Sequence, residues 1–274
     1  KNIWADKKKF VFDMSKISSS VLITNDDGYN AKGIKKLKEI SSSLFENIWL
    51  LAPKKNQSGK SHSITINKKL SINKIKIREY VLSGTPVDCA IIGLTKIMPT
   101  KTKPKLLLSG INVGVNLGLD LLYSGTVAAA REASINGVKS IALSVDKNNK
   151  KVNWSAVNYF APKIIKCLYE KKISNDYFFN VNFPSLSAEL IKGTKVVILG
   201  NRKPGSLLIT DIVNGKKIFK IPSERKILKD AQAGEDEFEL RKNYITITIH
   251  NNKNLILSEK ENLKYKAILG KIIE

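Results

Sequence analysis

The stretch SSSVLITNDDGYNAKGIKKL, residues 18–37, decides the fold. It opens with a short apolar run over residues 21–23 and stops abruptly at the polar turn 25–28, which reads Asn-Asp-Asp-Gly. Apolar residues then recur with helical spacing from Ile34 to Ile40. A strand, an acidic turn and a helix in this order are typical of an open α/β sheet, whose functional sites lie at the carboxyl ends of the strands.

The two adjacent carboxylates of that turn, Asp26 and Asp27, repel each other. Such a pair usually exists where a cation or hydrogen-bond donors offset the repulsion. The structural alternative is a tight turn held by hydrogen bonds from an asparagine or aspartate side chain. The turn alone does not decide between these two readings.

The alternation of strand and helix continues to about residue 185. Strands are expected at 48–52, 106–108, 140–145 and 177–184, and helices at 86–98, from 124–126 onward and at 153–171. Connections between them are short enough for a mostly parallel sheet. We therefore expect a Rossmann-like, doubly wound α/β core over residues 20–185.

Residues 186–274 have a different character. Here we expect a hairpin around Asn214-Gly215, a charged loop at 229–243, a strand at 244–250, and an amphipathic helix at 257–273 with Leu263, Ile268 and Ile272 among its apolar residues. An earlier hairpin, over 64–83, is expected outside the alternation of strand and helix. The region 186–274 is thus predicted to be a β-rich arm with a terminal helix that makes subunit contacts. Residues 1–19 are predicted to be an N-terminal extension without an assigned function.

The composition excludes several classes of protein. With 42% apolar residues among 274, disorder throughout the chain is not expected. The two cysteines, Cys89 and Cys167, lie far apart in apolar segments and are predicted to be reduced thiols, as in a cytoplasmic protein. No apolar run approaches the roughly 20 residues of a membrane span.

The charge is strongly basic, with 47 basic and 24 acidic residues and a net charge of +23. A polyanionic partner is one explanation. A compositional bias is the favoured one, because lysines are scattered singly and no basic-aromatic cluster occurs. Nucleic acid is therefore not expected as a specific partner, and a non-catalytic polyanion or nucleic-acid binding protein is kept as the alternative function.

Oxygen-bearing side chains follow three of the predicted strands. Asp26 and Asp27 follow the first, Ser58 lies in the polar loop after the second, and Asn112 lies in the glycine- and asparagine-rich stretch after a third. These positions share one edge of a parallel sheet. A set of oxygen ligands without a histidine-cysteine cluster favours one divalent cation, and an open coordination sphere favours Mg²⁺ or Mn²⁺ for catalysis.

The segment Ser124-Gly125-Thr126 opens a helix close to that edge. Its free N–H groups, its hydroxyls and the positive end of the helix dipole can bind an anion, although most such starts are plain caps. A cation beside a phosphate site suggests phosphoryl transfer to water.

Six motifs carry a family resemblance: TNDDG at 24–28, APKKNQSGKSHSIT at 52–65, SGTPVDC at 83–89, LSGINVGVNLG at 108–118, YSGTVAAA at 123–130 and NVNFP at 180–184. In this order they resemble the survival protein SurE family of metal-dependent nucleotidases. The resemblance implies the metal ligands Asp26, Asp27, Ser58 and Asn112. It also implies that His62, Asn116, Ser124, Gly125 and Thr126 surround the substrate phosphate.

The activity implied by this resemblance is hydrolysis of nucleoside 5′-monophosphates, with 3′-nucleotides and short polyphosphate as further substrates of some members. A homodimer or homotetramer held by the C-terminal arm is implied as well. One departure is Ile249, where the family usually has a proline. The proton acceptor is left open between Asp27 and a metal-generated hydroxide, and His62 is a candidate to protonate the leaving oxygen.

Overall fold

The computed structural model describes residues 16–99, 103–147, 151–202, 209–221, 230–254 and 256–270. Most of the predicted N-terminal extension lies outside this part of the chain. The first strand, β1, begins at Ile17 and runs to Thr24, so the core starts slightly earlier than residue 20.

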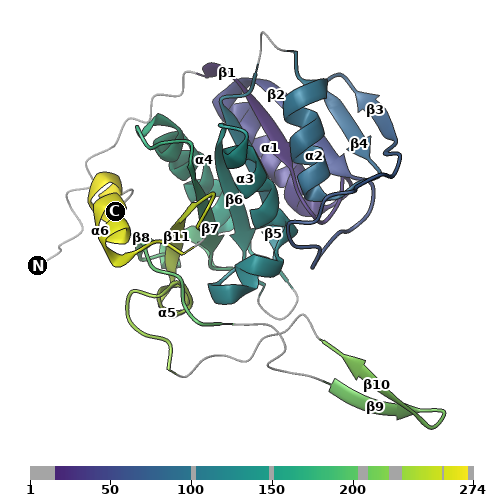
Figure 1. Cartoon of the computed structure of the whole chain (residues 1–274). Helices are drawn as coiled ribbons and strands as arrows, with labels where there is room; N and C mark the ends of the chain where they lie inside the picture. The colour runs from purple at the N-terminus through teal and green to yellow at the C-terminus, as the bar shows by residue number, and fades with distance from the viewer. Residues whose placement is uncertain are drawn as a thin grey trace, which may run out of the picture.

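A nine-stranded sheet forms the centre of the molecule, in the order β3-β4-β2-β1-β5-β6-β7-β11-β8 (Figure 1). Its strands are β1, β2 (Phe45–Pro53), β3 (Ile72–Lys76), β4 (Glu79–Leu82), β5 (Leu106–Val113), β6 (Lys139–Val145), β7 (Tyr177–Phe183), β8 (Gly193–Val196) and β11 (Tyr244–Asn251). The six strands from β4 to β7 in this order are parallel. Strand β3 pairs antiparallel with β4, and β11 pairs antiparallel with β7 but parallel with β8. The predicted Rossmann-like, mostly parallel sheet is confirmed.

Helices cover both faces of the sheet because alternate residues of each central strand point to opposite sides. Val21 and Ile23 pack with α1 (Lys32–Leu44) and α4 (Ser155–Glu170) on one face. Leu22 packs with α2 (Pro86–Ile92) and α3 (Gly125–Ile135) on the other (Figure 1). Shorter turns of helix occur at Gly93–Ile97, Gly118–Tyr123 and Ala188–Leu190.

Helix α2 begins at Pro86, where the sequence predicts the start of a helix. Thr85 caps the helix and Asp88 completes a capping box. The Asp88 carboxylate also accepts hydrogen bonds from the backbone N–H and hydroxyl of Thr65, at 2.9 and 2.6 Å. Because this side chain holds the backbone near residue 65, residues 64–71 do not form a strand. The hairpin expected over 64–83 is shorter, and consists of β3 and β4.

Strand β5 extends beyond the predicted residues 106–108 to Val113. Its bend lies at Gly110, whose φ of 137° favours glycine. A Cβ at this position would lie 2.3 Å from the carbonyl oxygen of Leu143 in β6. Glycine at this position therefore allows the backbones of β5 and β6 to approach closely.

The C-terminal region contributes to the same sheet. Strand β11 pairs with β7, and β8 pairs with β11, so residue 185 does not mark the end of the sheet. The predicted loop at 229–243 contains a short helix, α5 (Asp236–Arg241), whose first turn carries three acidic side chains that favour the positive end of the helix dipole.

Two elements lie outside the central sheet (Figure 1). The predicted hairpin is confirmed as β9 (Ile209–Val213) and β10 (Lys216–Lys220), joined by Asn214 and Gly215 with φ of 52° and 72°. It projects from the body, and all its strand residues are exposed. In α6 (Glu259–Leu269) Tyr265 and Leu269 are buried, whereas the predicted apolar residues Leu263 and Ile268 are exposed and Ile272 lies outside the described residues.

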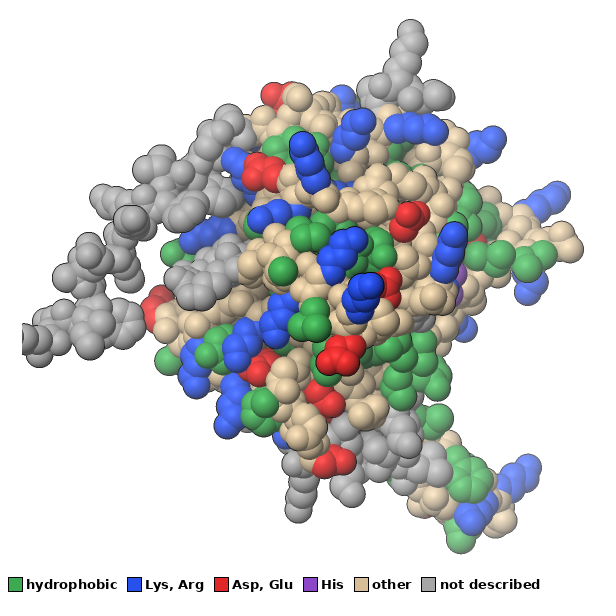
Figure 2. Space-filling view, turned by 60° about the vertical axis from the view of Figure 1, so that its left-hand side comes forward, with side chains coloured by type: hydrophobic (Ala, Val, Ile, Leu, Met, Phe, Trp, Pro, Cys, Tyr) green, Lys and Arg blue, Asp and Glu red, His purple; other side chains and the backbone are tan. Residues whose placement is uncertain are grey.

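The surface agrees with a scattered basic charge. Lysine and arginine side chains are spread singly over the face shown in Figure 2. Within the described part of the chain, no helix has both the length and the apolar character needed to cross a membrane.

Candidate functional site

The acidic turn at the end of β1 is held by Asn25 and not by the aspartates. The Asn25 side chain donates to the carbonyl oxygen of Gly28 at 3.0 Å and accepts from the Gly28 N–H at 3.2 Å. The side chain of Asn25 alone thus makes the hydrogen bonds of the tight turn. The carboxylates of Asp26 and Asp27 are left for another purpose.

Asp26 is buried at the end of β1 and is contacted by two distant segments. The hydroxyl of Thr126, at the start of α3, donates to its Oδ1 at 2.5 Å. The backbone N–H of Gln57, in the loop after β2, donates to its carbonyl oxygen at 2.7 Å. Burial raises the pKa of the Asp26 carboxyl, and the hydrogen bond from Thr126 opposes this shift.

Asp27 is half-buried and links two further loops. The Asn56 side chain donates to its Oδ1 at 3.3 Å, and the backbone of Val113, at the end of β5, also hydrogen-bonds to it. Burial, followed by the charge of Asp26, raises the pKa of the Asp27 carboxyl to about 6, while the bond from Val113 lowers it.

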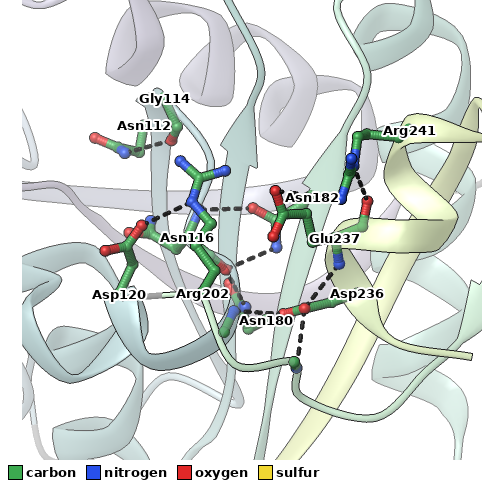
Figure 3. A network of polar contacts seen from close by, with 12 residues as sticks. Asn112, Gly114, Asn116, Asp120, Asn180, Asn182, Arg202, Asp236, Glu237 and Arg241 are labelled. Carbon is green, nitrogen blue, oxygen red and sulfur yellow. Dashed lines mark hydrogen bonds and ion pairs between the residues drawn. The ribbon is translucent and has the colours of Figure 1, made fainter. Parts of the chain in front are cut away.

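The other two predicted ligands lie in the segments that contact Asp27: Ser58 in the loop after β2, and Asn112 near the end of β5. The backbone N–H of Ser58 donates to the side chain of Asn56 at 2.8 Å. Asn112 directly precedes Val113, and its Nδ2 donates to the Gly114 carbonyl at 2.6 Å (Figure 3). Among the described residues, no hydrogen bond engages the Ser58 hydroxyl or the Asn112 Oδ1. The structure therefore brings all four predicted ligands to one edge of the sheet.

The chemistry of this donor set fits a hard divalent cation. Two adjacent carboxylates, one of them fully buried, repel each other, and within the described ranges no lysine or arginine pairs with either. The unengaged oxygens of Ser58 and Asn112 add neutral ligands of the kind that Mg²⁺ and Mn²⁺ accept. Over the same residues, no group of three or more His, Cys, Asp or Glu side chains could hold a metal, so the set is not a zinc-type cluster.

The N-terminus of α3 lies directly against Asp26. A Cβ on Gly125 would be 2.9 Å from the Asp26 Cβ and 3.0 Å from the Pro86 side chain, so only glycine allows this approach. Ser124 caps the helix by accepting from the Val127 N–H at 3.1 Å. Because the Thr126 hydroxyl is donated to Asp26 and the Val127 N–H to Ser124, the donors left for an anion include the Gly125 N–H and the Ser124 hydroxyl.

Asn116 lies at the base of the loop that follows β5, where β7 anchors it (Figure 3). Its backbone N–H donates to the Asn182 side chain at 2.8 Å, and its carbonyl accepts from the side chains of Asn180 and Asn182 at 2.9 and 3.1 Å. Its own Nδ2 donates to the Ser144 hydroxyl at 2.8 Å. These bonds fix the loop, and none of them joins Asn116 to the acidic pair.

His62 lies in the loop after β2 and contacts α3 further from its N-terminus than Thr126. Its Nε2 lies 2.9 Å from Glu132, about 9 Å along the helix axis from Thr126. Its buried Nδ1 has no hydrogen-bond partner among the residues described. Of the predicted site residues, His62 is the one that the observed contacts connect least directly to Asp26 and Asp27.

Several residues that shape the site were not predicted. Asn180 and Asn182 could have been found, because two asparagines at alternate positions of a buried strand face the same side and need partners. Asn56 and Glu132 act through contacts between distant segments, and the sequence carries no local signal for them.

Comparisons with known proteins place the chain in one family. The family model described as "Survival protein SurE" matches residues 21–206. A relative named 5′-nucleotidase SurE from Paramagnetospirillum magneticum is 43% identical over 189 residues, covering 69% of this chain and 72% of the relative. The protein of the same name from Bradyrhizobium diazoefficiens is 38% identical over 234 residues, covering 83% and 91%. The crystal structure of the SurE protein from Aquifex aeolicus is similar with a TM-score of 0.76 and 34% identity, over 91% of this chain and 99% of that one.

Proposed function

The chain belongs to the survival protein SurE family, and from this premise we propose that it is a metal-dependent 5′-nucleotidase, which hydrolyses nucleoside 5′-monophosphates. The observation that carries the proposal is the pair Asp26 and Asp27. These carboxylates lie side by side, one of them buried, against the N-terminus of α3. A cation site beside an anion site is what phosphomonoester hydrolysis requires.

We propose that one divalent cation, Mg²⁺ or Mn²⁺, is held by Asp26, Asp27, Ser58 and Asn112. When bound, it supplies positive charge that polarises a phosphoryl oxygen and lowers the pKa of the attacking water. The support for this assignment is the donor set itself: two carboxylates and two unengaged neutral oxygens. The chain's own residues orient these ligands, since Thr126 holds Asp26 and Asn56 holds Asp27.

The substrate phosphate is proposed to bind at the start of α3, at Ser124, Gly125 and Thr126, with Asn116 on the neighbouring loop. Backbone N–H groups at a helix N-terminus favour a negatively charged ligand. The close contact between Gly125 and Asp26 brings this anion site next to the carboxylates. A phosphate bound there would lie next to the proposed metal ligands.

Two residues are proposed for proton transfer. Asp27, the more exposed of the two carboxylates, accepts a proton from the attacking water. His62 protonates the leaving oxygen, and the contact of its Nε2 with Glu132 at 2.9 Å holds the imidazole in place.

The experiment that tests this function is a panel of phosphate-release assays. Nucleoside 5′-monophosphates, 3′-monophosphates and short polyphosphate are compared at fixed Mg²⁺ and Mn²⁺ concentrations. We expect the 5′-monophosphates to be hydrolysed, with any activity on the other two classes being additional. Absence of phosphate release from every member, together with tight and salt-dependent binding of long polyanions, would instead favour the non-catalytic alternative.

We further propose that residues 20–185 form the catalytic core and residues 186–274 an oligomerisation region of a homodimer or homotetramer. The support is the projecting β9–β10 hairpin, whose exposed apolar side chains include Ile212, Ile218 and Phe219. A cytoplasmic location is proposed because Cys89 and Cys167 are free thiols.

A further inference from the structure

The loop from Gly114 to Asp120 carries Asn116, and it is fixed from two sides. On one side β7 holds Asn116 through Asn180 and Asn182. On the other side the loop meets chain segments that follow residue 185. The backbone N–H of Leu119 donates to the carbonyl of Arg202 at 2.6 Å, and the Arg202 side chain pairs with Asp120 at 3.0 Å.

One carboxylate lies at the centre of this second contact. Asp236 is fully buried, and its Oδ2 accepts from the backbone N–H of Gly118 at 2.8 Å. Its Oδ1 accepts from the N–H groups of Gly200 and Glu237 at 3.1 and 2.8 Å (Figure 3). Asp236 thus joins the loop of Asn116 to both chain segments from which the β9–β10 hairpin departs.

Burial of the Asp236 carboxylate costs free energy, which argues that its contact with the loop is not incidental. Burial raises the pKa of the Asp236 carboxyl to about 6, although the three backbone N–H groups oppose the shift. An apolar or amide side chain would avoid this cost. A carboxylate is favoured at this position because its two oxygens together accept all three N–H groups.

We propose that Asp236 is a positioning residue of the active site, which holds the loop 114–120 so that Asn116 can meet the substrate phosphate. This inference rests on the proposed function. Asp236 lies outside residues 21–206, which the family model matches, and it is separated from the loop by more than a hundred residues of sequence. The C-terminal region therefore contributes to the catalytic site as well as to the projecting arm.

The Asp236→Asn variant tests the proposal with little change of shape. An asparagine has one acceptor oxygen and one amide donor. With the oxygen kept on Gly200 and Glu237, the amide faces the Gly118 N–H, so two donors oppose each other and the loop is released. The opposite rotamer would lose two hydrogen bonds in place of one, and is therefore disfavoured.

We expect Asp236→Asn to lower kcat/KM for the best nucleoside 5′-monophosphate about 10- to 100-fold, the cost of a misplaced binding group. Asn116→Ala should show a comparable loss, and the double variant should lose little more than either single one, because both act through the same contact. Additive losses, or a kcat/KM within about twofold of wild type for Asp236→Asn, would overturn the proposal.

Glu239→Gln is the matched control. Glu239 is a buried carboxylate in the same helix, and it also accepts a backbone N–H, from Gly234 at 3.0 Å, but it does not contact the loop. It should lose stability while kcat/KM stays within about twofold of wild type. A loss of kcat/KM equal to that of Asp236→Asn would mean that general destabilisation is the cause.

Hydrogen exchange in the wild-type protein provides a check that needs no variant. We expect the Gly118 amide to be protected as strongly as the amides of β7, and rapid exchange would contradict the proposed tie. The activity of the wild-type protein separates the proposed nucleotidase function from the proposed role of Asp236. An inactive wild type refutes the nucleotidase, whereas an active wild type with an unaffected Asp236→Asn variant refutes only the role of Asp236.

Discussion

The Asp26→Ala variant is expected to lose about a thousandfold or more of kcat/KM for phosphate release from a nucleoside 5′-monophosphate. The change removes a proposed metal ligand and leaves the Thr126 hydroxyl without its acceptor. It also removes one of the two negative charges that would attract the cation. Initial rates of phosphate release, measured at saturating Mn²⁺ with and without the substitution, provide the test.

Asp146→Ala is the control for this variant. Asp146 follows β6 directly, at the same edge of the sheet, and its carboxylate accepts the neighbouring N–H of Lys147. Its loss should change the rate by no more than about twofold, as expected for a residue outside the site. Thermal unfolding should show both variants to be folded. An Asp26→Ala variant that retains wild-type activity would exclude Asp26 from the chemistry.

The Gly33→Ala variant is expected to destabilise the fold by about 3 kcal/mol or more. A Cβ at Gly33 would lie 1.8 Å from the carbonyl oxygen of Ile111, so α1 and β5 must separate. This contact is between two backbones, and no flexible side chain can move aside to relieve it. Because Ile111 directly precedes Asn112, activity should fall together with stability. Urea denaturation measures the change in the free energy of unfolding.

Gly137→Ala separates this clash from the general cost of replacing a glycine. Gly137 has a φ of 72°, and a Cβ added there would meet no described atom within 4 Å. Its substitution should therefore cost only the backbone strain, about 1–2 kcal/mol. Equal destabilisation by the two substitutions would show that the contact between α1 and β5 is not what requires glycine at position 33.

The central part of the fold follows from local patterns. The apolar runs at 21–23 and 106–108 are long enough only for buried strands, and the spacing from Ile34 to Ile40 places one face of α1 on them. The same patterns place Asp26, Asp27 and Ser58 after strands, whereas β5 runs past its predicted end at residue 108 and includes Asn112. Parallel strands make this inference possible, because all their carboxyl ends share one edge.

Errors arose where a distant side chain overrides a local pattern. Residues 64–71 alternate like a strand, but Asp88 binds the backbone at Thr65 and no strand forms there. The charged stretch 229–243 reads as a loop, although it contains α5, whose Asp236 accepts hydrogen bonds from Gly118 and Gly200. Neither contact leaves a periodic trace in the sequence, so only the folded structure reveals it.

The central claim is that the oxygens at the strand ends hold a cation that hydrolysis requires. It is tested most directly by the rate of phosphate release from a nucleoside 5′-monophosphate, measured against free Mn²⁺ concentration after the protein has been treated with a chelator. We predict no activity without added metal, saturation as Mn²⁺ rises, and a half-saturating concentration at least about tenfold higher in Asp27→Asn. A rate that does not depend on Mn²⁺ or Mg²⁺, or identical curves for the two proteins, would contradict the claim.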